Sequence, residues 1–190
     1  MDILINNLLL KVKTSYSTLA ALFVSALLLS SCGMEYERWD KDGDGIDPAE
    51  FAATLAATGY FDAWDGDNDN FLNESETYNA LFVAMDANEN DRLSFEEWAV
   101  LREFNQEEID QEFGEFSSWD ADSSGYVERI ELINGLEGNR MYSDMDINND
   151  MLLTEAEFAT GLFNAWDRSN DERIDREEFN DLGFGLQPAG

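Results

Sequence analysis

The sequence predicts an all-α fold of six helix–loop–helix units, arranged as a duplicated set of three loops, with helices shared between neighbouring units. Three observations predict it: an acidic pattern of about twelve residues recurs along the chain, aromatic or methionine residues stand at fixed positions before each copy, and the second half repeats the spacing of the first. Of the 190 residues, 44% are hydrophobic, which is enough to build a packed core despite a formal net charge of −31.

The composition excludes several classes of function. With 42 acidic residues against 11 basic ones, the chain repels phosphate backbones, so we expect no binding to nucleic acid. The chain has no histidine, and Cys32 is its single cysteine. Without histidine there is no imidazole-rich metal site, and without histidine or a further, free cysteine there is no nucleophile–base pair, so we expect the protein not to be an enzyme.

Residues 1–31 differ in composition from the rest of the chain. Lys11 and Lys13 precede an apolar run over residues 19–29, which is typical of a secretory signal peptide. A short transmembrane anchor is the alternative, although the run is shorter than the roughly 20 residues that a membrane-spanning helix needs. The sequence therefore predicts that residues 1–31 are a signal peptide.

The end of this segment contains a possible lipidation site. Residues 29–33 read Leu-Ser-Ser-Cys-Gly, which resembles the bacterial lipobox, where the cysteine is acylated and becomes the first residue of the mature chain. This resemblance implies that Cys32 carries the lipid. It also implies that residues 32–190 form a protein of the bacterial cell envelope, anchored to a membrane on the periplasmic or the outer-membrane or cell-surface side.

The clearest copy of the acidic pattern is residues 65–76, which read DGDNDNFLNESE. Oxygen-bearing side chains stand at positions 1, 3, 5, 9 and 12 of this segment. These are the ligand positions of the EF-hand calcium loop, in which the backbone carbonyl of position 7 is a further ligand. Calcium is a hard cation that takes six to eight oxygen ligands, and short Asp, Asn and Ser side chains suit the tight first half of such a loop.

Five further copies complete the set. We name the loops one to six in chain order: residues 40–50, 65–76, 86–97, 120–131, 146–157 and 167–178. Loop one is one residue shorter than the others, so that Glu50 falls at its position 11. In an EF-hand, the aliphatic residue at position 8 forms a short strand contact with a paired loop. The predicted calcium ligands are Asp40, Asp42, Asp44 and Glu50 in loop one; Asp65, Asp67, Asp69, Phe71 and Glu76 in loop two; Asp86, Asn88, Asn90, Arg92 and Glu97 in loop three; Asp120, Asp122, Ser124, Tyr126 and Glu131 in loop four; Asp146, Asn148, Asp150, Leu152 and Glu157 in loop five; and Asp167, Ser169, Asp171, Arg173 and Glu178 in loop six.

A second pattern, independent of the ligands, lies in the helices that enter the loops. The residue before each loop and the residue four before the loop start are aromatic or methionine, and this spacing places them on one helix face. We interpret them as core residues: Tyr36, Trp39, Phe61, Trp64, Phe82, Met85, Phe116, Trp119, Tyr142, Met145, Phe163 and Trp166. Because few residues separate loop two from three and loop five from six, residues 74–85 and 155–166 are each predicted to be one shared helix.

The loop starts reveal an internal duplication. Loops four, five and six repeat the spacing of loops one, two and three at an offset of 80 or 81 residues. This predicts two three-loop units, over residues 32–105 and 106–190. The close spacing resembles that of the calcium repeats of dockerins and of the periplasmic lanmodulins, although the proline that lanmodulins carry at loop position 2 is missing from all six loops.

The loops are predicted to differ in affinity. Position 6 needs a positive φ, which glycine adopts freely and asparagine or aspartate tolerates, so Gly125, Asn70 and Asp91 suit it better than Met151 and Glu172. Ligand charge is the second criterion, and loop three has few acids. We therefore expect loops two and four to bind most strongly and loops three, five and six more weakly, while loop one is rich in acid but one residue short.

Two functions fit these predictions. The first is a lipid-anchored calcium-binding protein that acts as a sensor or a local buffer. The alternative is a calcium-stabilised interaction or adhesion module, similar to a dockerin, that binds an unidentified protein partner and holds its ions structurally. Lanthanides are a further possible ligand, since oxygen cages also accept trivalent ions. In either case, acids clustered without metal repel one another, and we expect the fold to depend on calcium.

Overall fold

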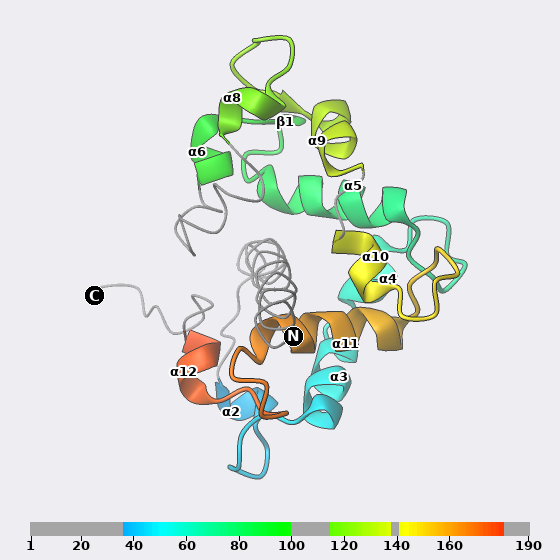
Figure 1. Cartoon of the computed structure of the whole chain (residues 1–190), viewed down its shortest axis with the longest axis vertical. Coiled ribbons are helices and arrows are strands. Elements are labelled where there is room, and N and C mark those ends of the chain that lie inside the picture. The colour runs from blue at the N-terminus through cyan, green and yellow to red at the C-terminus, as the bar shows by residue number, and fades with distance from the viewer. Residues whose placement is uncertain (1–35, 100–114, 138–140, 181–190) are drawn as a thin grey trace, which may run out of the picture.

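The computed structural model describes residues 36–99, 115–137 and 141–180, which are mostly helical (Figure 1). The predictions for residues 1–31, for Cys32 and for the boundary between residues 105 and 106 lie outside these ranges. The helices are α2 (Tyr36–Trp39), α3 (Pro48–Ala56), α4 (Tyr60–Trp64), α5 (Glu74–Met85), α6 (Phe95–Ala99), α8 (Phe116–Trp119), α9 (Arg129–Leu136), α10 (Met141–Met145), α11 (Glu155–Trp166) and α12 (Arg176–Phe179), and the strands are β1 (Arg92–Leu93) and β2 (Val127–Glu128).

The helices that leave the loops begin at the last four loop residues. At the start of α5, the Asn73 side chain accepts a hydrogen bond from the Glu76 N–H at 3.0 Å, and the Glu76 carboxylate accepts one from the Asn73 N–H at 3.0 Å. This reciprocal capping box satisfies two N–H groups that a helix start leaves without a partner. The same arrangement begins α3, α11 and α12. The acid that ends each of these loops therefore also starts the next helix.

The two shared helices have the predicted bounds. Helix α5 joins loop two to loop three and α11 joins loop five to loop six, each in 12 residues. Each ends where the next loop starts, with the N–H of Asp86 or Asp167 donating to a carbonyl in the last helical turn. The predictions of single helices over residues 74–85 and 155–166 are confirmed. Each of these two helices therefore has a loop directly at both of its ends.

The loops pair in a nested order through their position-8 residues. Leu93 of β1 lies opposite Val127 of β2 in an antiparallel pair, so loops three and four are partners. Isolated antiparallel bridges join Leu72 to Leu153 and Ile46 to Ile174, which pairs loop two with five and loop one with six. Every one of these bridges therefore joins one predicted three-loop unit to the other.

The core lies between these pairs. Helix α3 packs on α11, and α5 packs on α9, as Figure 1 shows. Around α11, the centroid of the Trp166 ring lies 5.0 Å from that of Phe51 and 5.9 Å from that of Trp39. Near loops three and four, the ring centroids of Trp98 and Trp119 are 5.0 Å apart. The prediction that the residues before the loops pack in the core is confirmed for ten of the twelve, and Trp64 and Phe116 are partly buried against it.

One glycine in the core is required by close packing. A Cβ atom added to Gly161, in the middle of α11, would lie 2.5 Å from Cγ of Met145, the last residue of α10. Such a contact is far inside van der Waals distance, so any larger residue at this position would displace the Met145 side chain. Gly161 therefore allows the helix that enters loop five to lie directly on the helix that leaves it.

Candidate metal centres

The backbone of loops two to six follows one repeated conformation. Position 6 has a positive φ in every one, with values of 69° at Asn70, 65° at Asp91, 87° at Gly125, 67° at Met151 and 66° at Glu172. The prediction of a left-handed residue at position 6 is thus confirmed, even where the side chain disfavours it. A non-glycine residue of this kind costs about 1–2 kcal/mol, so the fold holds Met151 and Glu172 in a strained conformation.

Position 4 is also left-handed, which the sequence reasoning missed. The residues are Asn68, Glu89, Ser123, Asn149 and Asn170, with φ between 56° and 61°. Three of the five are asparagines, and asparagine tolerates this region better than most residues. The frequency of asparagine at position 4 was the feature of the sequence that could have predicted this conformation. Together, the two left-handed positions curl the first half of each loop so that its N–H groups point inwards.

The aspartate at position 1 receives two of these N–H groups. In loop two, the Asp65 carboxylate accepts from the N–H of Asp69 at 3.2 Å and of Asn70 at 2.8 Å. The first aspartate of loops three, four, five and six accepts in the same way from positions 5 and 6. Five of the predicted ligands are thereby fixed at the centre of their loops: Asp65, Asp86, Asp120, Asp146 and Asp167.

The glutamate at position 12 folds back over the same centre. In loop two, Oε1 of Glu76 accepts from the N–H of Gly66 at 2.9 Å and of Asp67 at 3.3 Å. Glu97, Glu131, Glu157 and Glu178 make the equivalent contact with the N–H of position 3 in their own loops. The ends of each twelve-residue segment are therefore brought together around the inward-facing oxygens.

The side chain at position 5 lies next to position 7 of the same loop. In loops two to six its side-chain oxygen accepts from the N–H of position 7, so Asp69, Asn90, Ser124, Asp150 and Asp171 each lie beside the residue whose carbonyl was predicted to bind calcium: Phe71, Arg92, Tyr126, Leu152 or Arg173. In loops two, four and five, the position-3 side chain also accepts from the N–H of position 5: Asp67, Asp122 and Asn148.

Three groups of carboxylates come close enough to share one cation. Among the described residues these are Asp40, Asp42 and Asp44 of loop one, Asp65, Asp67 and Glu76 of loop two, and Asp120, Asp122 and Glu131 of loop four, each with ligand oxygens within 4.8 Å of one another. Calcium–oxygen distances of about 2.3–2.6 Å place ligands on opposite sides of one ion about 4.6–5.2 Å apart. The donor sets of loops two and four therefore fit a cation of calcium's size and hardness.

The other three loops use neutral side chains at position 3. In loop three, Nδ2 of Asn88 donates to the Glu97 carboxylate at 2.6 Å, and in loop six the Ser169 hydroxyl donates to Asp167 at 3.2 Å. A neutral group beside a carboxylate lowers the charge available to a divalent ion. The structure thus distinguishes loops two and four from loops three and six by the same criterion, ligand charge, that the sequence suggested.

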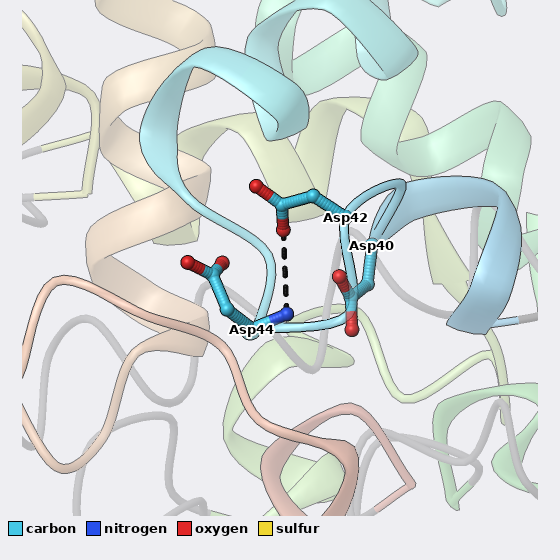
Figure 2. A group of neighbouring side chains, drawn as sticks. All are labelled: Asp40, Asp42 and Asp44. Atoms are coloured by element: carbon cyan, nitrogen blue, oxygen red, sulfur yellow. Dashed lines mark hydrogen bonds between the residues drawn. The ribbon is translucent and has the colours of Figure 1, made fainter.

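Loop one differs because it lacks a position-7 residue. Gly43 and Gly45 have the positive φ values of positions 4 and 6, 86° and 99°, and the next residue, Ile46, makes the bridge of position 8. The three aspartates converge from one short turn, with the Asp42 carboxylate accepting from the Asp44 N–H at 3.3 Å (Figure 2). The missing residue is therefore the one whose carbonyl would be a ligand. The count from the loop start could not locate this gap.

Glu50 nevertheless takes the place of a position-12 glutamate. Its carboxylate accepts from the N–H of Lys41 at 2.9 Å and from that of Asp47 at 3.2 Å, and it stands three residues after the helix cap Asp47. Asp40 accepts from the N–H of Gly43 at 2.7 Å, rather than from positions 5 and 6 as in the other loops. Loop one thus keeps its closing glutamate but not the hydrogen bonding of its first aspartate.

Crowding of carboxylates shifts the pKa of several of these groups. A side-chain hydrogen bond with Asp42, helped by partial desolvation, raises the pKa of Asp44; partial desolvation and the charges of Asp69 and Glu76 raise that of Asp67. Glu157 behaves oppositely: desolvation acts to raise its pKa, but hydrogen bonds from Thr154, Asn148 and Ile147 together outweigh desolvation and lower it. Neighbouring carboxylates therefore repel Asp44 and Asp67 in the metal-free chain, whereas Glu157, the last residue of loop five, is stabilised as the anion.

In the part of the chain that the structure describes, no helix is both long enough and apolar enough to cross a bilayer. No protein-family model matches the chain, and no curated protein is found to be similar to it. Its assignment therefore rests on its own residues.

Proposed function

We propose that this protein binds calcium through EF-hand loops and acts as a calcium sensor or local buffer, anchored by lipid at Cys32 to a membrane of a bacterial cell envelope. The observation that carries the proposal is the repeated hydrogen bonding of loops two to six. In each, the first aspartate is held by the N–H groups of positions 5 and 6 while the last glutamate folds back onto position 3.

The donor atoms favour calcium over softer metals. The converging groups of loops two and four consist of carboxylate oxygens, and oxygen ligands suit hard cations such as calcium. Trivalent lanthanides are hard as well and provide a useful comparison ion. In both loops the carboxylates at positions 1, 3 and 12 would hold the ion, with the position-7 carbonyl beside them.

The coupling of loops to core supports the sensor reading. Met85 and Trp166, the last residues of α5 and α11, are buried, and each directly precedes a loop. A change in loop geometry on ion binding would therefore move a core side chain. A buffer would bind the same ions without exposing or burying apolar surface, so a hydrophobic dye distinguishes the two.

One observation keeps the interaction module as a second candidate. Large apolar side chains are exposed among the described residues, with Met151 77%, Ile130 62% and Ile147 60% exposed. Such residues suit contact with a protein partner. A module of this kind would stay calcium-saturated across the physiological range and would show no calcium-dependent dye binding there.

Calcium stoichiometry tests the proposal directly. The full chain, purified in detergent, is titrated with calcium by calorimetry and its bound ions are counted by native mass spectrometry. We expect several ions per chain and one fewer in Asp65→Asn. Asp62→Asn is the matched control, because Asp62 is an exposed acid of α4 outside the loop and its loss changes the charge equally. A wild-type chain that binds no calcium would contradict the proposal.

A further inference from the structure

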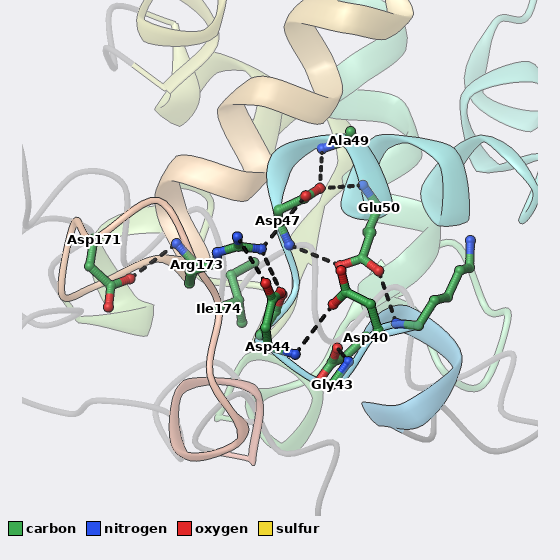
Figure 3. Close-up of polar contacts among 12 residues, drawn as sticks. Asp40, Gly43, Asp44, Asp47, Ala49, Glu50, Asp171, Arg173 and Ile174 are labelled. Carbon is green, nitrogen blue, oxygen red and sulfur yellow. Dashed lines mark hydrogen bonds and ion pairs between the residues drawn. The ribbon is translucent and has the colours of Figure 1, made fainter.

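Loop one is contacted by a cation from another part of its own chain. Nη1 of Arg173 lies 2.9 Å from Oδ1 of Asp44, and Nη2 lies 3.3 Å from Oδ2 (Figure 3). The guanidinium thus binds both oxygens of the carboxylate at position 5. Nη1 also donates to the Gly45 carbonyl at 3.2 Å and lies 3.6 Å from the Asp47 carboxylate. Three oxygen-bearing groups of loop one therefore face one positive charge.

The nested pairing brings Arg173 to this place. Ile174 exchanges two backbone hydrogen bonds with Ile46, at 2.9 and 3.1 Å, so the residue before Ile174 is held against loop one. The aliphatic stem of Arg173 then passes over Gly45, where an added Cβ would lie 3.4 Å from Cβ of Arg173. An added Cβ would therefore make only ordinary contact with the stem, and it is the positive φ of 99° that favours glycine at position 6.

Arg173 contacts loop one at the place where that loop lacks a residue. Loop one has no position-7 residue, and the guanidinium contacts the groups that flank the gap, Asp44 and Gly45 on one side and Asp47 on the other. In the pair formed by loops three and four, position 7 is present in both loops, and there the Arg92 guanidinium instead stacks 4.1 Å from the centre of the Tyr126 ring. The arginine of loop six turns onto ligand groups where its partner loop is short.

A further arginine provides a contrast. Arg129, just after β2, pairs with Asp91 of loop three at 2.5 Å. Asp91 stands at position 6, whose side chain is not a predicted ligand, whereas Asp44 stands at position 5, whose side chain is. Both pairs join partner loops and are partly exposed, yet only the pair of Arg173 involves a ligand position.

We propose that Arg173 is the resident cation of loop one, so that this loop stays closed by a guanidinium while only loops two to six take calcium. The inference rests on the proposed calcium binding of those five loops. Arginine keeps its charge at any physiological pH, and a bidentate guanidinium occupies both oxygens of Asp44. With the position-7 carbonyl missing as well, the ligands left to an ion fall below the six to eight oxygens that calcium takes.

Ion counting on four variants tests this. The full chain in detergent is loaded with calcium and analysed by native mass spectrometry and calorimetry. We expect Asp42→Asn, which removes a loop-one acid that Arg173 does not touch, to leave the wild-type count unchanged. Arg173→Met, which keeps the backbone carbonyl of loop six, should gain one ion, and the double variant with Asp42→Asn should lose it again. Arg129→Met, the matched control, should gain none.

Several results would overturn the inference while leaving calcium binding intact. They are the loss of one ion in Asp42→Asn alone, no gain in Arg173→Met, or an equal gain in Arg129→Met, which would show a general effect of charge. Absence of calcium from every variant, the wild type included, would instead overturn the proposed function and this inference with it.

A second measurement uses only chains that keep Arg173. In ¹⁵N-labelled protein, the side-chain signals of Arg173 should show slow rotation of the guanidinium, both without metal and at saturating calcium, and fast rotation in Asp44→Asn. Release of the guanidinium on addition of calcium to the wild type would overturn the inference even if Arg173→Met fails to fold.

Discussion

Leu72 and Leu153 exchange two backbone hydrogen bonds, at 2.9 and 2.8 Å, across the middle pair of loops. The hydroxyl of Tyr142, which is buried in α10, reaches this bridge and contacts the carbonyls of Leu72 and Met151 at 2.8 Å each. One side chain from the helix before loop five therefore fastens loop two to loop five. This junction joins the first three loops of the chain to the last three.

Removing that hydroxyl should loosen the junction. Tyr142→Phe removes the hydroxyl that contacts both carbonyls, although the Leu72 carbonyl keeps the Leu153 N–H as a donor. We expect the free energy of unfolding to fall by about 1–2 kcal/mol, measured by urea denaturation. Tyr78→Phe is the matched control, because Tyr78 is also buried but its hydroxyl donates to Leu136 at the longer distance of 3.4 Å. A loss in Tyr78→Phe as large as that in Tyr142→Phe would contradict the assigned role.

A methyl group at Gly161 should disturb the core. In Gly161→Ala the added Cβ collides with Met145, and overpacking of this kind costs about 1–3 kcal/mol. Thermal unfolding in excess chelator measures it without any contribution from bound ions. Gly66→Ala is the control, since its Cβ would lie 3.6 Å from the Glu76 carboxylate, an ordinary contact. Equal melting temperatures for Gly161→Ala and the wild type would rule out the close packing of α10 on α11.

The left-handed residues at position 6 predict gains rather than losses. Met151 has a φ of 67° and is 77% exposed, so Met151→Gly relieves strain and gives up little packing. We expect about 1 kcal/mol of added stability and up to about a tenfold tighter calcium site in loop five. Calorimetry of the variant against Asn70→Gly gives the comparison, because asparagine already tolerates this conformation. Weaker binding by Met151→Gly would contradict the strain argument.

The raised pKa of Asp67 predicts opposite effects with and without calcium. Because folding raises this pKa, the folded metal-free chain holds the proton more tightly than the unfolded chain does, and its stability falls as pH rises through the shifted pKa. Asp67→Asn removes the charge permanently. It should raise the melting temperature in chelator at pH 7 and weaken calcium binding by loop two.

Asp62→Asn again serves as the control for that variant. It alters the same net charge outside the loop, and we expect no change in calcium count and a smaller change in melting temperature. If Asp67→Asn were less stable than the wild type in chelator at pH 7, desolvation of the Asp67 carboxylate and its repulsion by Asp69 and Glu76 would not be the cause of the raised pKa.

The sequence was most informative where local chemistry decides the structure. The helices over residues 74–85 and 155–166 were predicted to the residue, because the spacing of loops leaves room for one helix and a capping box marks its start. The positive φ at position 6 followed from the inward turn of the loop, including at Met151 and Glu172, where residue type alone argues against it.

The sequence was uninformative where the choice depends on partners. All six loops carry an aliphatic residue at the bridging position, so nothing in Leu72 or Ile46 indicates whether its partner is near or far along the chain. Nor could a one-residue gap in loop one be located by counting, since Gly43 and Gly45 could be aligned in more than one way. The contact of Arg173 with Asp44 follows from both, and it required the nested pairing to be known.

The nested order of pairing also affects the order in which the loop pairs can form during folding. The bridged residues are 34 positions apart for loops three and four, 81 for loops two and five, and 128 for loops one and six. Closing the widest pair first would cost roughly 1 kcal/mol more loop entropy than closing the narrowest, whereas each inner pair, once formed, shortens the span left for the next. We therefore expect loops three and four to pair first, loops two and five next, and loops one and six last. The pair that closes last is the one in which Arg173 contacts Asp44.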